Sequence, residues 1–284
     1  MIKVNDLLYG SIELPQVFKE LLETAALKRL GGIHQSGAIF LVNPDVRHTR
    51  LEHSIGVALL IRMLGGSEEE QIAGLLHDVS HTAFSHVADY VFERESEDYH
   101  EKIFAQVLHD SEIPAVLEKF GYSLERQLSG DFSILEQPLP NLCADRLDYT
   151  LRDALYAGII GRGEAGEFLK SCTVHDGRIM VEDEQKANWI NVVFDRLNNG
   201  FFMHPLYMYA NKKMAVLIRQ FIDNGQLTEA DLLKDDTHLL NKIRSTVDGR
   251  EAIQAIRRQE GFQTFLKKEH SFKIKKRFLR ALFI

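Results

Sequence analysis

Apolar residues recur with a helical period along most of the chain. Between Leu51 and Leu64 they return every three or four positions, which places them on one face of a helix that Gly65-Gly66 should end. Ser67 followed by Glu70 is a capping box, and it opens a second helix with the sequence EEEQIAGLLHDV. The pattern predicts further helices over roughly 82–94, 99–110, 141–157, 186–200, 205–224, 229–235 and 250–259.

One internal stretch departs from the helical period. Residues 173–181, TVHDGRIMV, surround Asp176-Gly177, a pair typical of a two-residue hairpin turn. The last residues, FKIKKRFLRALFI, fit either a strand or a basic helix. No fixed-period repeat, low-complexity tract or linker interrupts the chain. We therefore expect an all-α fold with a small β-hairpin near 173–181, in a single domain over residues 1–284.

Composition is that of an ordinary globular protein. Of the 284 residues, 45% are hydrophobic and 26% are charged. No apolar run approaches the roughly 20 residues that a membrane-spanning helix needs. The opening residues, MIKVNDLLYG, carry no basic region followed by an apolar core, so nothing marks the chain for export. We expect a cytoplasmic protein that does not enter a membrane.

Cysteine content and charge narrow the function classes further. Cys143 and Cys172 are far apart and form no CxxC pair, which argues against a disulfide framework and a thiolate zinc site. The net charge of −7 gives no broad basic surface, so nucleic acid is not an expected partner. The tail after Phe265 is a local basic exception, interpreted first as a solvated face or edge strand and second as a phosphate-binding patch.

Histidines and aspartates cluster in three short strings. Seven of the twelve histidines lie between positions 48 and 109. The strings are RHTRLEHSIGV at 47–57, LLHDVSHTAFSH at 75–86 and NLCADRLDYTLRD at 141–153. A divalent metal that activates water for attack on phosphorus needs neutral imidazoles and ionised carboxylates. Taken singly, each of these residues is as well explained as a buried histidine or a helix cap, but their order and separation together indicate a metal site.

The three strings resemble the signature H…HD…D of the HD superfamily of metal-dependent phosphohydrolases. They are most similar to the branch that contains deoxynucleoside triphosphate triphosphohydrolases, with the patterns R-F-E-H-S-L-G-V, H-D-x-x-H-x-x-F-S-H and D-(K/R)-x-D-Y-x-x-R-D. The resemblance covers about residues 15–215. It implies a helical HD-domain fold, with a metal-binding core at about 45–160 and a helical C-terminal extension at about 186–284.

The resemblance assigns the metal ligands to four positions: His53, His77, Asp78 and Asp145. Asp148 lies in the same third string, and spacing alone leaves it open as a ligand. We favour Asp145 because it heads the D-R-x-D-Y string, whereas Asp148 could hold a ligand in place or pair with Arg152 at i+4. Mixed nitrogen and oxygen ligands suit one divalent ion, Mn, Fe, Ni, Co, Zn or Mg, and do not choose among them.

The same resemblance implies catalytic and substrate-binding groups. His81, His86 and His100 match the family's active-site histidines, and which of them donates the proton is left open. Because His81 follows His77 by four residues, a continuing helix would put both on one face. The substrate-binding positions are Arg50 and Arg146 for phosphate oxygens, Tyr149 beneath a sugar, Asp153 for its 3′-hydroxyl, and Tyr209 and Lys212 near phosphates.

Two positions depart from the family pattern. The string ALKRLGG keeps Leu30, which in the family lies against the 2′ carbon, but has Arg29 where the family's glutamine contacts the sugar 3′-hydroxyl. Arg29 is therefore expected to reach the sugar end of the pocket and to alter sugar selectivity. Asn211 replaces a family histidine. No equivalent of the family's nucleotide-binding regulatory segments is evident.

The residues and the resemblance together predict a metal-dependent phosphohydrolase acting on a nucleotide, with a dNTP triphosphohydrolase as the sharpest form. A second hypothesis is a dinuclear phosphodiesterase or oxygenase, in which His100 or His109 would supply additional ligands. A third is a non-catalytic nucleotide-binding module. The expected partner is a nucleotide or another phosphorylated small molecule, and a homo-oligomer is expected only by analogy with relatives.

Overall fold

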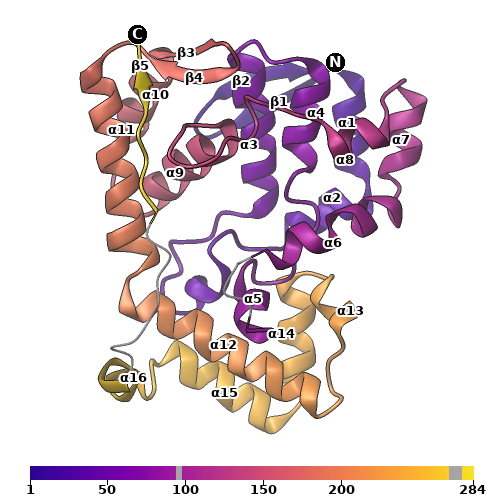
Figure 1. Ribbon diagram of the computed structural model, residues 1–284. Helices are drawn as coiled ribbons and strands as arrows, with labels where there is room; N and C mark the ends of the chain where they lie inside the picture. The colour runs from indigo at the N-terminus through magenta and orange to yellow at the C-terminus, as the bar shows by residue number, and fades with distance from the viewer. Residues whose placement is uncertain (94–97, 269–276) are drawn as a thin grey trace.

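The computed structural model describes residues 1–93, 98–268 and 277–284 (Figure 1). Helices make up more than half of these residues, so the mainly helical fold expected from the sequence is confirmed. The α-helices are α1 (Gln16–Glu23), α2 (Ala25–Leu30), α3 (Arg50–Met63), α4 (Glu68–Leu76), α5 (Val87–Val91), α6 (Tyr99–His109), α7 (Ile113–Lys119), α8 (Leu124–Ser129), α9 (Ala144–Tyr156), α10 (Arg162–Lys170), α11 (Glu184–Arg196), α12 (Pro205–Asp223), α13 (Glu229–Leu232), α14 (Asp236–Arg244), α15 (Val247–Arg257) and α16 (Phe262–Lys268). A 3-10 helix, η1 (Gly37–Leu41), and a π-helix, η2 (Leu197–Phe202), add to them.

The β-structure of the described residues is confined to two small sheets. An N-terminal hairpin, which the sequence did not predict, pairs β1 (Ile2–Asp6) with β2 (Gly10–Leu14). The predicted hairpin is confirmed as β3 (Cys172–His175) and β4 (Arg178–Val181). Its turn residues Asp176 and Gly177 have φ angles of 48° and 71°, the left-handed conformations that a tight hairpin turn requires. A short strand, β5 (Leu282–Phe283), adds parallel to β4. Residues 269–276 of the tail, among them Lys273, Lys275 and Lys276, lie outside the described residues.

Local capping explains where the two central helices begin. Thr49 and Glu52 form a reciprocal capping box at the start of α3, and Gly65 with φ 81° follows its end. Ser67 caps α4 by accepting from the backbone nitrogen of Glu70 at 3.1 Å. The predicted capping box is wrong in its second bond, from the Glu70 side chain back to the backbone nitrogen of Ser67. The Glu70 carboxylate accepts instead from the backbone nitrogens of residues 134 and 135, in the segment that leads to α9.

The described residues form two large hydrophobic cores. The first surrounds α3, which packs against α4 and α9, and it also receives side chains from the N-terminal hairpin and from α1, α7, α10 and α11. The second lies among α5, α12, α14 and α15. Figure 1 shows these two groups of helices at opposite ends of the molecule, with both chain termini at the end that holds the first core.

Buried polar contacts join the second core to the loops that carry the histidine motifs. The Asp236 carboxylate, at the start of α14, accepts from the backbone nitrogens of Phe84 at 2.6 Å and His34 at 3.0 Å. The backbone nitrogen of Asp236 donates to the carbonyl of Gly32 at 3.1 Å. Because Asp236 is only 1% exposed, these bonds are shielded from water and hold the C-terminal half against the histidine loops.

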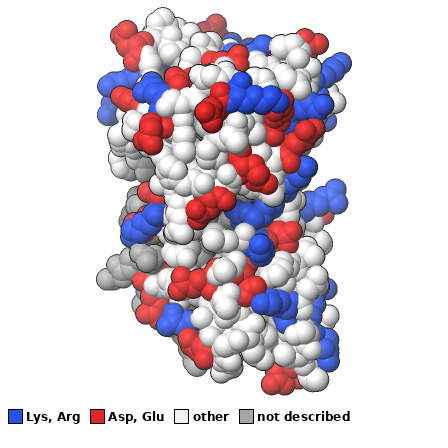
Figure 2. Space-filling model, turned by 90° about the vertical axis from the view of Figure 1, so that its right-hand side faces the viewer, with Lys and Arg blue, Asp and Glu red and all other residues white. Residues whose placement is uncertain are grey.

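The surface carries charges of both signs. Figure 2 shows acidic and basic side chains interspersed over one face of the molecule, as the modest net charge of −7 would suggest. Among the residues that the structure describes, no helix combines the length and the apolar composition that crossing a bilayer requires.

Candidate metal centre and active site

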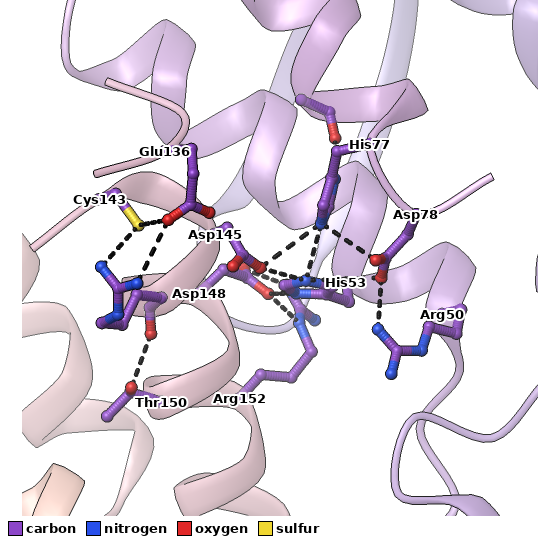
Figure 3. A network of polar contacts seen from close by, with 12 residues as sticks. Arg50, His53, His77, Asp78, Glu136, Cys143, Asp145, Asp148, Thr150 and Arg152 are labelled. Atoms are coloured by element: carbon purple, nitrogen blue, oxygen red, sulfur yellow. Dashed lines mark hydrogen bonds and ion pairs between the residues drawn. The ribbon is translucent and has the colours of Figure 1, made fainter. Parts of the chain in front are cut away.

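Side chains from α3, from α9 and from the residues that follow α4 converge beside a cavity (Figure 3). His53 projects from α3, His77 and Asp78 follow the last residue of α4, and Asp145 lies in the first turn of α9. His53 Nε2 lies 3.0 Å from Asp145 Oδ1, 3.3 Å from His77 Nε2 and 3.7 Å from Asp78 Oδ2. His77 Nε2 lies 3.5 Å from Asp145 Oδ1 and 3.4 Å from Asp78 Oδ1.

The remaining nitrogen of each imidazole has an acceptor. His53 Nδ1 lies 2.7 Å from Asp148 Oδ1, and His77 Nδ1 lies 2.7 Å from the carbonyl oxygen of Gly74. Both partners only accept, so the protons belong on the Nδ1 atoms. The Nε2 atoms of His53 and His77, which carry lone pairs when the imidazoles are neutral, therefore face each other and the carboxylates of Asp78 and Asp145.

This donor set fits a divalent cation. Ligand atoms with bonds of about 2.1 Å to one ion lie roughly 3 Å apart, close to the separations of 3.0–3.7 Å measured here. If both imidazoles are neutral, their Nε2 lone pairs lie 3.3 Å apart and repel each other, and a cation bound between them would relieve this repulsion. Neutral imidazoles and ionised carboxylates are ligands of Mn, Fe, Co, Ni and Zn, so the residues present suit the ion that the sequence predicts.

The pKa values of the converging residues also favour a bound cation. Burial by itself would lower the pKa of His53, but hydrogen bonds to Asp145 and Asp148 outweigh it and raise the pKa to about 10. Burial would raise the pKa of Asp78, but the Arg50 guanidinium, 2.7 Å from Asp78 Oδ2, holds it well below its usual range. The centre is thus a concentration of negative charge that attracts either a proton or a metal ion.

Asp148 faces away from Asp145 and toward the back of the centre. Its Oδ1 accepts from His53 Nδ1 and from Arg152 Nε, the latter at 2.9 Å, and its Oδ2 accepts from the Tyr9 hydroxyl at 2.8 Å. Arg152 also contacts Asp6 Oδ2 at 3.0 Å. Asp148 thus holds His53 and anchors the N-terminal hairpin, whereas Asp145 presents its carboxylate to both Nε2 atoms.

Three further histidines form a group beside the centre. The rings of His81 and His100 stack with centroids 3.8 Å apart, and His86 lies edge-on to His81 at 4.9 Å. His81 Nε2 donates to Asp78 Oδ1 at 3.1 Å. Burial first, and then the charge of Arg50, depress the pKa of His81 well below its usual value, while burial and then His86 lower the pKa of His100 to about 4.

His86 differs from its two neighbours in having a carboxylate behind it. Its Nδ1 donates to Asp89 Oδ2 at 3.1 Å, and its side chain is 44% exposed. Asp89 is buried and also accepts from the backbone nitrogen of Tyr99 at 3.1 Å, so its position is fixed. This hydrogen bond orients the imidazole, which lines the cavity.

The loop between α4 and α5 overturns two predictions. The helix expected over 82–94 is limited to α5, because Phe84 and Ser85 have φ angles of 58° and 54°. His77 and His81 do not share one continuing helix, since α4 ends at Leu76. The irregular backbone is stabilised by tertiary bonds that no local pattern encodes, among them the bond from the Phe84 nitrogen to Asp236.

A cavity of about 1770 Å³ opens onto the centre. His77, Asp78 and Asp145 line it, whereas His53 is 1% exposed and reaches the centre from behind. The predicted catalytic and substrate-binding residues also line it: His81, His86, His100, Arg50, Arg146, Tyr149, Asp153 and Lys212. Many of these side chains also have protein partners. Arg50 binds Asp78 and Ser85, Arg146 binds Glu136 and nearby carbonyls, and Asp153 accepts from His48.

The expectation for Arg29 is wrong. Its guanidinium donates to the carbonyls of Val79 at 2.6 Å, His81 at 2.7 Å and Lys234 at 3.2 Å. Arg29 and the fully buried Leu30 are not among the residues that line the cavity. Arg29 therefore supports the backbone of the loop after His77-Asp78, and its charge is directed at carbonyl dipoles rather than at a substrate.

On α12, the prediction for Tyr209 is wrong, and the structure shows where Asn211 lies. Tyr209 does not approach the cavity, because its hydroxyl donates to the carbonyl of Glu260 at 2.7 Å and its ring packs on Phe262 and Phe265. Asn211 lines the cavity, but its Oδ1 accepts from the backbone nitrogen of Ala38 at 2.7 Å, so it also fixes the start of η1.

The sequence did not predict three residues that support the site. Asp89 lies three residues after His86, a spacing that could have identified it as the partner of that histidine. His48 and Tyr9 gave no such signal, because they reach Asp153 and Asp148 across more than 100 residues of chain.

A second group of donor atoms adjoins the first. Glu136, Cys143 and Asp145 bring one ligand atom each within 4.8 Å of one another. Arg146 already contacts this group, with Nη1 3.2 Å from Cys143 Sγ and Nη2 3.2 Å from Glu136 Oε1. Among the described residues, the donor groups contain neither His100 nor His109, which were considered as additional ligands.

Comparison with known proteins agrees with this geometry. The family model described as HD domain matches residues 50–153, the span that holds all four converging side chains. The chain is 48% identical over 246 residues to the uncharacterized protein YdhJ of Bacillus subtilis, covering 86% of this chain and 76% of that protein. It is 31% identical over 268 residues to the metal-dependent phosphohydrolase cns2 of Cordyceps militaris, covering 91% and 77%. The chain belongs to the HD-domain family of metal-dependent phosphohydrolases.

Other similar proteins are less alike in sequence. Human SAMHD1, a deoxynucleoside triphosphate triphosphohydrolase, is 26% identical over 261 residues, which cover 72% of this chain but only 42% of SAMHD1. A crystal structure of a hypothetical protein from Aquifex aeolicus has a TM-score of 0.71 at 23% identity, over 91% of this chain and 76% of that one. The likeness to that structure concerns the fold alone.

Proposed function

We propose that this HD-family hydrolase cleaves phosphate esters or anhydrides of nucleotides, with one divalent metal held by His53, His77, Asp78 and Asp145. The observation that carries the proposal is the convergence of these donor atoms at the floor of a cavity whose walls hold histidines, arginines and a lysine. Histidine, arginine and lysine beside a cation suit a polyanionic substrate, because they bind and neutralise phosphate oxygens. When bound, the metal supplies Lewis-acid activation of phosphate and water.

The chain's own residues supply position and proton transfer. Arg50 and His81 each donate a hydrogen bond to one oxygen of Asp78, and these two bonds hold the carboxylate toward the proposed metal site. His86 is the proposed proton donor to the leaving oxygen, since Asp89 orients its ring and its side chain is exposed in the cavity. With their pKa values lowered, His81 and His100 stay neutral at pH 7 and act as hydrogen-bonding groups.

The residues that line the cavity support a nucleotide as the substrate. Arg146 and Lys212 are suited to phosphates, Tyr149 to stacking beneath a sugar, and Asp153 to a sugar hydroxyl. The most specific substrate that we propose is a deoxynucleoside triphosphate, and the similarity to SAMHD1 supports this choice. The cavity is large enough for such a ligand, since ligand pockets are generally about 300–1,000 Å³.

Metal analysis coupled to a nucleotide hydrolysis screen tests the proposal. The purified chain, loaded in turn with Mn, Co, Ni and Mg, should bind one ion per chain and release phosphate or triphosphate from at least one nucleotide. His77→Ala and Asp145→Asn should abolish both metal binding and turnover. Two ions per chain would favour the dinuclear alternative, and nucleotide binding without turnover would favour the non-catalytic one.

A further inference from the structure

Glu70 is a buried acidic residue that does not line the cavity. It lies in the first turn of α4 and is only 8% exposed. Its Oε1 accepts from the backbone nitrogens of Ile134 at 2.7 Å and Leu135 at 3.1 Å. Hydrogen bonds to a carboxylate are stronger than those between neutral groups, and burial shields them from water. These two bonds attach the segment that leads to α9 firmly to α4.

The same segment holds the start of α9. The carbonyl oxygen of Ile134 accepts from the backbone nitrogen of Ala144 at 2.7 Å, and that of Leu135 accepts from the backbone nitrogen of Asp145 at 3.2 Å. The N-cap residue of α9, Cys143, provides no side-chain hydrogen bond to the helix. The first N–H groups of a helix have no partner within the helix. Here the carbonyl oxygens of the preceding segment take the place of a side-chain cap.

This backbone cap bears on the direction of the Asp145 carboxylate. An acidic side chain in the first turn of a helix is attracted to the free N–H groups there. The backbone nitrogens of Ala144 and Asp145 already donate to carbonyl oxygens, which reduces that attraction. The Asp145 carboxylate faces the imidazoles instead, with Oδ1 3.0 Å from His53 Nε2 and 3.5 Å from His77 Nε2.

Helix α4 therefore has two links to the proposed metal site. His77 follows its last residue, and Glu70 lies in its first turn. We propose that Glu70 is a positioning residue, which fixes the first turn of α9 through the backbone of residues 134 and 135 and so directs the Asp145 carboxylate at the metal ion. The inference rests on the proposed metal site and adds a residue that touches neither the ion nor the substrate.

Titration with Co(II) tests the inference in variants of Glu70. Glu70→Gln keeps the size of the side chain but weakens both hydrogen bonds, so we expect the Kd for Co(II) to rise about 10-fold, the lower end of the effect of groups that orient a ligand. Glu70→Met removes both acceptors and should raise the Kd further. Glu69→Gln is the matched control, because it makes the same change of charge at the next residue. The Glu69 side chain is 34% exposed and pairs with Arg126 at 3.5 Å, so this variant should keep the wild-type Kd.

The visible absorption spectrum of the Co(II)-loaded protein separates positioning from stability. The d–d bands of Co(II) respond to the geometry of its ligands, and denaturant unfolding of the metal-free protein measures stability in parallel. A higher Kd and a changed spectrum in folded Glu70→Gln would support the positioning role, and Glu70→Met provides the same comparison if Glu70→Gln does not fold. Lower stability with the wild-type Kd and spectrum would overturn the positioning role and leave the proposed metal site intact. A wild type that binds no ion would overturn both.

Discussion

Asp145 and Asp148 lie three residues apart on α9, yet their carboxylates have different partners. Asp145 faces the Nε2 atoms of His53 and His77, while Asp148 accepts the Nδ1 proton of His53 and the guanidinium of Arg152. A ligand histidine whose second nitrogen donates to a carboxylate is fixed in one tautomer and becomes a stronger base. At the scale of single residues, with His53 as the proposed ligand, the affinity for metal should thus depend on side chains that do not touch the ion.

Asp148→Asn tests this dependence. The amide oxygen can still accept from His53, but the charge opposite the buried Arg152 is lost, and only Asp6 remains to balance it. We expect metal affinity to fall about 10- to 100-fold and the free energy of unfolding to fall by about 3 kcal/mol. Metal titration and denaturant unfolding measure the two effects. Asp145→Asn is the control and should abolish metal binding, with a smaller effect on the stability of the metal-free protein. Wild-type affinity in Asp148→Asn would contradict the argument.

His86 and Asp89 give a second prediction at this scale. If His86 donates a proton to the leaving oxygen, His86→Gln should lower kcat by about 10²- to 10⁴-fold. Metal content and stability should stay unchanged, because the side chain is 44% exposed and is not one of the converging ligands. Asp89→Asn should lower kcat less, since it weakens the orientation of the ring without removing it. Steady-state kinetics with parallel metal analysis decide the point, and an unaltered kcat in His86→Gln would assign the proton to another group.

At the scale of elements, α3 approaches α9 so closely that one position must be glycine. A Cβ on Gly56 would lie 2.0 Å from an Arg152 nitrogen and 2.2 Å from Asp148 Oδ2. Both side chains are fully buried and bound to each other, so neither can move aside without breaking their pair. The crossing of the two helices is therefore matched to the ion pair that supports His53.

Gly56→Ala should disrupt this crossing. We expect a loss of about 1–3 kcal/mol in the free energy of unfolding, the usual effect of overpacking a core, together with weaker metal binding through the displaced Asp148. Gly166→Ala in α10 is the matched control, because a Cβ there meets nothing within 4 Å. It should stabilise the helix by about 0.5–1 kcal/mol. Equal stability of the two variants, measured by chemical denaturation, would show that the α3–α9 contact is not tight.

Arg29 supports the loop after α4 in the same way. Arg29→Gln removes donors from the carbonyls of Val79 and His81, so we expect a loss of about 1–3 kcal/mol in stability. Activity should fall by the same factor on all substrates, since the guanidinium does not line the cavity. The ratio of kcat/KM for 3′-phosphorylated and ordinary nucleotides should therefore stay constant. A change in that ratio would indicate that Arg29 contacts the substrate, contrary to this prediction.

At the scale of the whole molecule, the centre joins parts of the chain that are distant in sequence. Its four converging residues come from α3, from the residues that follow α4 and from α9. Asp236 joins the second core to the loop that follows Asp78. We propose that the two cores form one domain that unfolds in a single transition. Binding of a metal to the folded state alone would then stabilise the whole chain.

Removal of metal tests this coupling. At a free metal concentration of 100 times the Kd, binding contributes about 2.7 kcal/mol to the folded state, so a chelator should lower Tm by several degrees for a chain of this size. Adding back the ion should restore Tm, and His77→Ala should show no response to either treatment. Calorimetry with and without chelator measures both effects. Two separate transitions, only one of them sensitive to metal, would argue for two domains instead.

The sequence by itself determined the features that depend on neighbouring residues. Periodicity and caps located α3, α4, α9 and α12 to within a few residues, and Asp176-Gly177 predicted the hairpin, because these signals act over one turn of chain. The three ordered motifs identified the HD family, since chance does not reproduce several spaced residues together.

Only the tertiary structure decided where individual side chains point. Arg29 was expected at a sugar and instead binds carbonyls about 50 residues away, and His81 reaches Asp78 from a loop rather than a helix. The choice between Asp145 and Asp148 likewise depended on which carboxylate faced His53 Nε2. The direction of a side chain is set by packing between segments that are far apart in the chain. A buried hydrogen bond between such segments outweighs the local conformational preference of a residue. A short stretch of sequence does not contain both partners of such a bond, so it cannot predict the contact.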